Sequence, residues 1–519
     1  MSAVFAAYRI EVQLSAGVWT SLGTDVAKDP GPHFYLGCQQ NGPLDHVASV
    51  GLLDFEVKND DSHVSNGRKQ GWYSPNHVNC RTGWTFGIPV RVVSTYKSLA
   101  LGDSTAQDRV LWRGKIKNIV PAAGQYRTQR VAVTAQDAMG DLVDNEAVQI
   151  APQINQTEGT LIAAVLAAMS SSAQPPATSL DSSLDTFPYA FDNIGAGVKA
   201  MSALTDVVLS SYGWLYAKKD GTLTYENRHT RSLKTSQYTF SDLNHDDVAV
   251  PSGLDNVYNR VRVTIHPRTI DAAATTVLCA ATGVLAIAPK QTVTFFDNYR
   301  DPTNTLKLIG GTAFVTPLVA STDYLANSAN DGSGSDLTSS VSIAVSAFAA
   351  AAQFAITNNH PTATAYITKR QLRGKGIYDS DPVTFESYIA ESYGDRALPI
   401  DLAYQTDGVI AQSFADYIAQ LYSNQANQAD ELLLNPQRSD ALLTQALTRD
   451  LGDLVTESET MTGLSSALLA IVGIDMTIQP GNILEVRYLV AYAGNGLAFI
   501  FDDATHGVFD SAASPLGYA

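Results

Sequence analysis

Short segments of alternating apolar and polar residues, bounded by turn residues, limit the fold of this chain more than any other feature. Residues 4–14, 88–96 and 109–122 follow this pattern, and the turn cluster KDPGP stands at 28–32. Alternation predicts strands, because successive side chains of a strand point to opposite faces. Short strands between turn signals favour β-barrels or sandwiches over a parallel sheet.

The composition changes near residue 150, where helical spacing of apolar residues begins. Thr157 is a candidate N-cap for the first helix, and Gly213 suits the C-cap of the second. Residues 214–228 predict a β-hairpin, because the turn KKDG places Asp-Gly between two apolar runs. Three segments predict amphipathic helices: 157–171, 195–213 and 407–424.

The remaining segments return to β patterns. Residues 47–60 and 254–265 alternate, and 448–493 contain several strand-like runs. Residues 351–377 are interpreted as paired strands around a turn at Asn358–Pro361. The chain is therefore expected to be mainly β with α+β parts.

Size and charge restrict the function classes. A chain of 519 residues is expected to hold three or four domains of about 100–200 residues. Only 16% of its residues are charged, against about 25% in typical soluble domains. This suits a subunit that buries much of its surface against neighbours, and it also suits a plain β-rich protein. The net charge of −17 argues against general DNA binding. It remains compatible with a conduit, because an acidic lumen repels a duplex and lets it slide.

The cysteines and apolar runs predict no disulfides and no membrane span. Cys38, Cys80 and Cys279 form no CxxC pair, so buried free thiols are expected. A signal peptide has a basic region followed by a long apolar run, and the first residues of this chain lack this pattern. The richest apolar stretch, 341–356, is shorter than the ~20 residues of a spanning helix. We expect a soluble protein made in a reducing cytoplasm.

Two polar clusters could bind a cation. His245 is followed by Asp246 and Asp247 between a Ser/Thr run and a Pro/Gly turn, so a solvated loop is the preferred interpretation. Residues 330–336 (NDGSGSD) are faintly similar to a calcium loop. They lack its alternating ligands and terminal Glu, which favours a flexible turn.

No catalytic motif stands out. The sequence has no GxSxG elbow, no P-loop and no strand-linked GxGxxG. His506 near Asp502 and Asp503 is an acid–base trio in a terminal segment that contains Gly and Ser. We therefore expect no catalytic residues, no bound cofactor and no metal site.

A series of segments resembles one family in its order along the chain. The segment that begins at Leu36, LGCQQNGPLDHVASVGLLDFEVKND, is similar to an "xRVAxxGxLxFxLxN" opening, with His46 where Arg is frequent. Residues 72–75 fit a "YSP" element that follows it. Further matching segments are GIPVRV (87–92), LWRGKIKNIVPAAG (111–124), RVAVTAQDAMGDL (130–142), DGTLTYENR (220–228), LDNVYNRVRVTI (254–265), AYITKRQLRGKGI (365–377), DLGDLVT (450–456) and FIFDDATHGVFDSAASPLGYA (499–519).

The family that these segments resemble is the tail-hub and minor tail proteins of bacteriophages, the baseplate central hubs of long-tailed phages. The resemblance implies two tail-tube-like β-barrel domains and two smaller mixed domains per subunit. The implied division is 1–145 (first barrel), 146–250 (mixed α/β), 251–395 (second barrel, with 270–350 as candidate inserted strands), 396–447 (helical part of a fourth domain) and 448–519 (strands that complete the barrel, and a tail).

The resemblance also implies a function and partners. Three chains would form a pseudo-sixfold ring at the tail tip of the virion, assembled in the host cytoplasm. The ring would join the tail tube, or a distal tail ring protein, to tip or fibre proteins. It would contact the tape-measure protein and let DNA pass without specific binding. Such a protein is structural and not an enzyme.

Two alternatives remain open. A receptor- or glycan-binding tail protein would expose aromatic side chains in loops such as 61–86, where Trp72, Tyr73 and Trp84 lie close in sequence. A cell-wall hydrolase would clear bacterial cell walls in a zymogram. Glycan binding by the isolated chain would favour the first.

Overall fold

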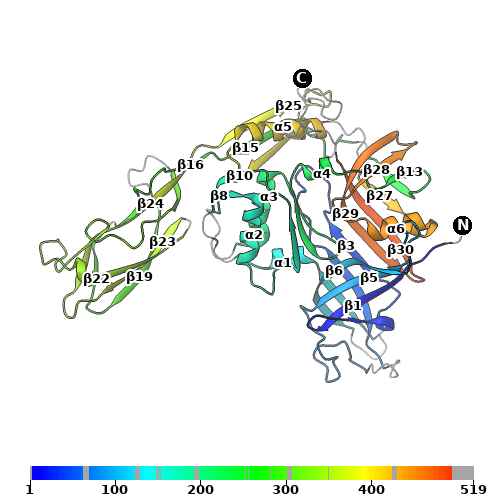
Figure 1. The fold of residues 1–519 in the computed structure, drawn as a ribbon, viewed down its shortest axis with the longest axis horizontal. Helices are drawn as coiled ribbons and strands as arrows, with labels where there is room; N and C mark the ends of the chain where they lie inside the picture. The colour runs from blue at the N-terminus through cyan, green and yellow to red at the C-terminus, as the bar shows by residue number, and fades with distance from the viewer. Residues whose placement is uncertain are drawn as a thin grey trace.

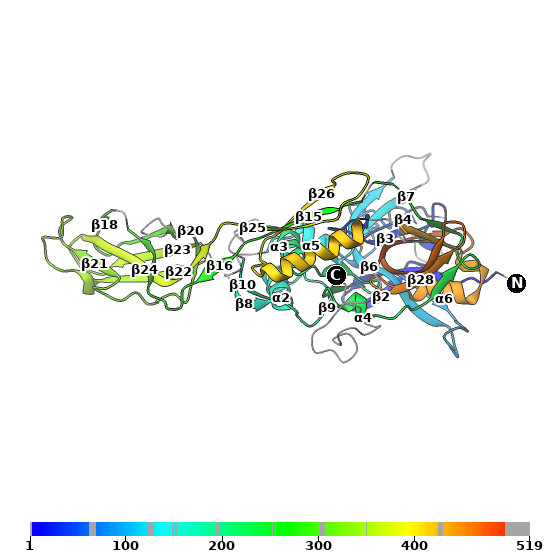
Figure 2. The same cartoon turned by 90° about the horizontal axis from the view of Figure 1, so that it is seen from above.

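The computed structural model describes residues 3–61, 69–122, 129–147, 150, 153–191, 198–251, 253–254, 256–281, 283–300, 307–348, 350–423 and 429–493. Figure 1 shows a body that contains the early (blue) and late (orange) strands side by side, and an elongated β unit that projects from it. Figure 2 shows the same projection from above. Strands dominate these residues and helices accompany them, so the mainly β class with α+β parts is confirmed.

A sheet of 13 strands forms the core of the body. All its pairs are antiparallel except one, in which β13 (Thr239–Ser241) lies parallel to β28 (Leu454–Glu459), which in turn pairs with β29. The described pairings trace an open path and include none of the closed barrels that the family resemblance implies. Its order is β14 (Asp247–Ala249), β27 (Glu431–Leu434), β30 (Ile483–Tyr492), β29 (Leu464–Gln479), β3 (His33–Gly37), β4 (Leu52–Lys58), β7 (Arg130–Gln136), β6 (Gln107–Pro121), β5 (Pro89–Tyr96), β1 (Ala7–Ser15) and β2 (Val18–Ser21).

An early and a late segment of the chain meet where β3 pairs with β29. The register runs from His33 opposite Thr477 to Gly37 opposite Gly473. Gly37 has a φ of +92°, and a Cβ at this position would lie 2.3 Å from the carbonyl oxygen of Val472. Only glycine accepts both the left-handed backbone and this close approach. The junction between early and late strands therefore depends on a glycine.

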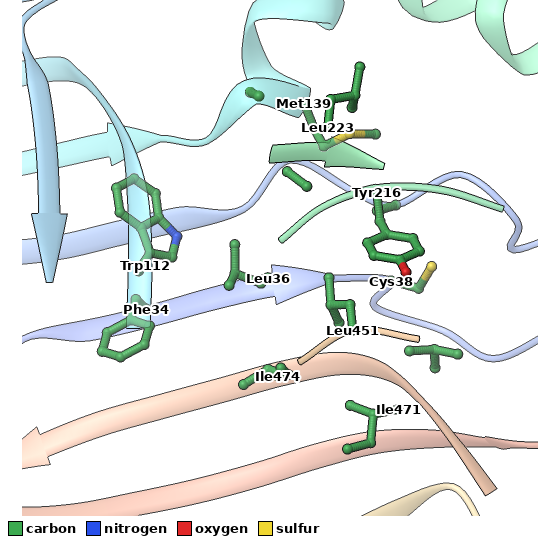
Figure 3. Packing of buried hydrophobic residues seen from close by; sticks show 14 of the residues in the cluster. Phe34, Leu36, Cys38, Trp112, Met139, Tyr216, Leu223, Leu451, Ile471 and Ile474 are labelled. Atoms are coloured by element: carbon green, nitrogen blue, oxygen red, sulfur yellow. The ribbon is translucent and has the colours of Figure 1, made fainter. Parts of the chain in front are cut away.

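Alternation along these strands buries one face of the sheet. In β4, Leu53, Phe55 and Val57 are buried, whereas the residues between them face outward. Figure 3 shows the core at the junction, where Phe34 and Leu36 of β3 and Trp112 of β6 lie above Ile471 and Ile474 of β29. Each of these five side chains is at most 1% exposed. The early and late strands thus share one hydrophobic core.

A mixed part packs against this sheet, and it confirms the helices expected within 157–171 and 195–213 and the hairpin at 214–228. The left-handed residue that ends the second helix is Tyr212 (φ 55°) and not Gly213 as expected. Gly213 is needed for another reason, since a Cβ there would lie 2.5 Å from the ring of Tyr225. The elements are α1 (Ala138–Asp144), β8 (Gln153–Thr157), α2 (Glu158–Ala168), β9 (Ala177–Leu180), β10 (Thr186–Ala190), α3 (Ala200–Ser211), β11 (Trp214–Ala217), β12 (Thr222–Glu226) and α4 (Thr230–Leu233).

A third part places helix α5 (Gly408–Tyr422) on a small sheet, which confirms the helix expected at 407–424. Asp407 accepts a hydrogen bond from the backbone N–H of Val409 and so caps the helix. Ala411, Ala415 and Ile418 face the sheet and are fully buried. The strands are β25 (Val383–Tyr388), β15 (Arg260–Ile265) and β26 (Ala397–Leu402), and helix α6 (Asp440–Thr448) lies further along the chain.

The projecting unit, defined here as residues 268–379, has a core of its own that includes Leu278, Phe354 and Ile367. β24 (Ala365–Asp379) pairs with β16 (Arg268–Ile270), β17 (Thr276–Ala280), β18 (Leu285–Ile287), β20 (Lys307–Thr312) and β21 (Tyr324–Asn327). A second sheet has the order β19 (Thr292–Asn298), β23 (Ala351–Asn358), β22 (Val341–Ala347). The expected pairing within 351–377 is wrong: β23 and β24 belong to different sheets, and the turn between them crosses from one to the other.

Candidate functional site

The outward face of the 13-stranded sheet carries a continuous row of polar side chains, which we call the polar face. Cross-strand partners place six residues in one row, because directly opposed residues share a face. The row comprises Glu485, Thr477, His33, Asp54, Thr134 and Asn118, from β30, β29, β3, β4, β7 and β6. These side chains are exposed or half-buried. Early and late parts of the chain therefore build one surface together.

Ion pairs link the strands across this face. Nε2 of His33 and Nη2 of Arg487 each lie 2.9 Å from a carboxylate oxygen of Asp475. Arg487 also reaches Glu431 at 3.2 Å. The hydrogen bond to Asp475 raises the pKa of His33. Burial raises the pKa of Asp475, but its bonds to His33 and Arg487 outweigh this and hold it below its ordinary value. The contacts therefore favour the charged forms of both His33 and Asp475.

The polar face is hollowed at this network and is acidic. A hollow of about 390 Å³ is lined by residues that include His33, Tyr35, Asp54, Glu431, Asp475 and Arg487. Asp54 accepts a hydrogen bond of 2.6 Å from Thr134 and keeps an outward position. Carboxylates outnumber guanidinium groups here, which agrees with the net charge of −17. Such a surface repels phosphates more than it attracts them.

In the cluster at 245–247, Asp246 and Asp247 are exposed, as in the solvated loop that the sequence favours, but His245 is buried. His245 is only 8% exposed, and its Nδ1 lies 2.9 Å from the buried carboxylate of Glu457. Burial raises the pKa of Glu457 to about 8. Asp246 instead pairs with Arg438 at 3.3 Å. The described residues contain no group of three His, Cys, Asp or Glu side chains that could hold a metal ion.

The segment 330–336 forms a turn held by its own hydrogen bonds. Oδ1 of Asp331 accepts bonds from the backbone N–H and the hydroxyl of Ser333. The amide of Asn327 donates to the carbonyls of Gly332 and Gly334. These side chains stabilise the turn itself and do not converge on an ion.

Tyr73 and Trp84 of the 61–86 loop belong to the core, whereas Phe86 at the end of this loop is exposed. Tyr73 and Trp84 are 0% and 3% exposed, and their rings meet edge to face at 4.8 Å. Nε1 of Trp84 donates to the carbonyl of Tyr73 at 3.0 Å. Trp72 is half-buried against the same cluster. The exposed aromatic platform that a glycan-binding loop needs is therefore not built by these three residues.

The cysteines are free thiols as expected, with Cys38 and Cys279 buried and Cys80 half-buried. His506, Asp502 and Asp503 lie outside the described residues. Within the described part of the chain, no helix is long and apolar enough to cross a membrane.

His46 stands where the family resemblance has Arg, and it is buried. Its ring stacks on Trp214 at 4.8 Å, and its Nδ1 lies 2.7 Å from the carbonyl of Gly213. Burial lowers the pKa of His46 to about 4, so the ring is neutral. Through Gly213 and Trp214, His46 connects the segment between β3 and β4 with the mixed part of the fold.

No family model matches the sequence, and neither does any curated protein. Among solved structures, the chain is similar to the 43 kDa tail protein of prophage MuSo2 from Shewanella oneidensis (TM-score 0.47, 11% identity, 93% of this chain and 98% of that one). It is also similar to a tail protein from Neisseria meningitidis MC58 (0.47, 10%, 94% and 97%). A third is the prophage tail protein gp18 from Listeria monocytogenes EGD-e (0.39, 9%, 93% and 94%). Likeness at this level does not assign the chain to a family.

Proposed function

We propose that this chain is a structural protein of a bacteriophage tail tip, in which three copies form a hub ring around a channel for DNA. The order of sequence motifs suggests the family, and the polar face is the observation that carries the proposal. This face spans early and late strands and is exposed and polar, and carboxylates outnumber guanidinium groups in its hollow. A channel with such a lining would repel phosphates and let DNA slide.

The edges of the sheet favour assembly with other subunits. Among the described pairings, β2 has only β1 as a neighbour, and β14 has only β27. Unpaired strand edges are available to another chain, and a rotational ring would cover them. The proposed partners are two further copies, the adjacent tail-tube or distal tail ring protein, the tape-measure protein, and fibre or tip proteins. We propose that the protein catalyses no reaction and binds no cofactor or metal. Its proposed location is the tail tip of the virion, after assembly in the host cytoplasm.

The division into a first barrel (1–145), a mixed domain (146–250), a second barrel (251–395), a helical part (396–447) and terminal strands (448–519) also remains a proposal. The separate core of residues 268–379 supports an insertion within the third of these segments.

Light scattering and electron microscopy of the purified chain test the ring. We expect a trimer with a central opening, formed either by the chain alone or after the adjacent tail ring protein is added. A monomer in both conditions would refute the hub. A zymogram without clearing is expected, and clearing would favour the hydrolase.

A charge reversal tests the lining. In the trimer, Asp54→Lys should increase retention of a short linear duplex more than Glu391→Lys, which reverses an exposed charge in the loop between β25 and β26. Equal retention by the two variants would show that the polar face does not line the channel.

A further inference from the structure

The second sheet of the projecting unit has an outward face without charged side chains, which we call the neutral face. Cross-strand partners place Phe296, Gln353 and Ser346 in one row, and Thr292, Thr357 and Ser342 in another. The remaining outward residues of the three strands are Thr294, Asn298, Ala344, Ala351 and Ala355. The chain has 85 charged residues, 34 Lys and Arg and 51 Asp and Glu. The lack of charge across three strands therefore distinguishes the neutral face from the acidic polar face.

A large aromatic side chain stands out on the neutral face. The ring of Phe296 is 59% exposed, and Phe348 lies beside it at 6.1 Å with an angle of 31° between the rings. The amide of Gln353 is its direct cross-strand neighbour, and Asn298 lies two residues along the same strand. An apolar ring is therefore flanked by amide and hydroxyl groups that can both donate and accept hydrogen bonds.

The fold does not need Phe296 for its core. The neighbouring Phe295 points inward and stacks on Phe354 at 5.8 Å. The charged residues nearby also point inward, because Arg370 lies over the ring of Phe295 and pairs with Asp297. The inner face thus supplies the stability of the unit, and the outer face is free for binding.

The unit is placed to reach a partner outside the body. Figures 1 and 2 show the second sheet away from the 13-stranded sheet. The two connections to the body run side by side, since Ile265 pairs with Val383 just before the root of the unit and Arg268 pairs with Asp379 just after it. A ligand on the neutral face would not meet the polar face.

We propose that the neutral face binds a neutral polysaccharide, with the ring of Phe296 against a sugar ring and with Gln353, Asn298 and Ser346 bonded to sugar hydroxyls. An exposed aromatic ring can cover the apolar face of a sugar ring, and the amide and hydroxyl groups beside it can bond sugar hydroxyls. An acidic glycan would need Lys or Arg, which this face lacks. A protein partner would need several large aromatic or Arg anchors, whereas short Thr, Ser and Ala side chains surround this aromatic pair.

Retention of the full chain on a panel of immobilised polysaccharides tests the proposal. The panel holds neutral glucans, mannans and galactans beside acidic polygalacturonate. We expect retention by at least one neutral polymer. Phe296→Ser should weaken it at least about tenfold, as loss of a central anchor does, and Gln353→Ala should weaken it less. The matched control is Phe86→Ser, which removes a 72% exposed phenylalanine from the body and should leave retention unchanged.

The outcomes separate this proposal from the hub function. No retention by any neutral polymer, retention only by polygalacturonate, or equal effects of Phe296→Ser and Phe86→Ser would overturn it. A loss of trimer or of binding to a tail protein in Phe296→Ser, with polysaccharide retention intact, would identify a protein surface instead. Light scattering of the same variants reports ring formation independently. Circular dichroism shows whether each variant is folded.

Discussion

The core at the junction of β3 and β29 and the core of the projecting unit are separate clusters, so their unfolding can be separated by mutation. Ile474 is 0% exposed and packs between early and late strands (Figure 3). Ile474→Ala removes three buried carbon atoms and leaves a cavity, which costs about 2–5 kcal/mol. The free energy of unfolding of the body should fall by this amount. Urea unfolding followed by tryptophan fluorescence measures it, because all five tryptophans precede the projecting unit in the sequence.

The matched variant is Ile356→Ala, in a side chain of the projecting unit that is also 0% exposed. It should cost a similar free energy locally and leave the tryptophan transition in place. Circular dichroism should then report an earlier loss of β structure in this variant. If Ile356→Ala shifts the tryptophan transition as far as Ile474→Ala does, the two cores unfold as one, and the separation argued from their packing is refuted.

Three further predictions concern single side chains of the body. Asp137 caps α1 and is buried, and burial raises its pKa to about 8 against 3.8 for an exposed carboxyl. Because ionisation is disfavoured in the folded state, the free energy of unfolding should fall between pH 5 and 9 by more in the wild type than in Asp137→Asn. Equal pH profiles of the two proteins in thermal melts would contradict this. Trp84→Ala should cost about 3–5 kcal/mol in urea unfolding without reducing polysaccharide retention of the folded protein, because the ring is buried; a selective loss of retention would return the glycan site to this loop. Asp475→Asn should change the free energy of unfolding by no more than about 1 kcal/mol, since its ion pairs are partly exposed, and a larger loss in urea unfolding would show that the network stabilises the sheet.

Local patterns predict the elements well where one physical signal dominates. The alternation at 47–60 and 88–96 gives β4 and β5, the apolar spacing at 407–424 gives α5, and the Asp-Gly turn gives the hairpin of β11 and β12. The pairing of β3 with β29 could not be predicted, because nothing in either strand identifies a partner more than 400 residues away. The polar face depends on that pairing, so its members could be expected to face outward but not to lie together.

Closeness in sequence does not predict which side chains are buried, and burial decides the role of several residues here. Trp72, Tyr73 and Trp84 suggest an exposed platform because they lie close together in sequence, yet the rings of Tyr73 and Trp84 are buried in the core and contact each other edge to face. The neighbouring Ser, Thr, Pro and Gly residues favour a solvated His245, but this side chain is buried beside the carboxylate of Glu457. The alternation in TVTFFDN predicts that one of its two phenylalanines lies outside, but the segment alone does not show that Phe296 is the exposed one.

The pairing of β3 with β29 also determines how long β3 remains unpaired during synthesis of the chain. His33 and Asp475 are 442 positions apart, and bacterial or eukaryotic ribosomes add about 5–20 residues per second. The ribosome therefore needs on the order of 20–90 s after making β3 to make β29. During this time one edge of β3 and part of its apolar face are uncovered. Contacts this distant in sequence slow folding as well. In a cell that makes many copies at once, these uncovered strands are open to pairing between chains, so the demand for chaperones should peak before the last strands leave the ribosome.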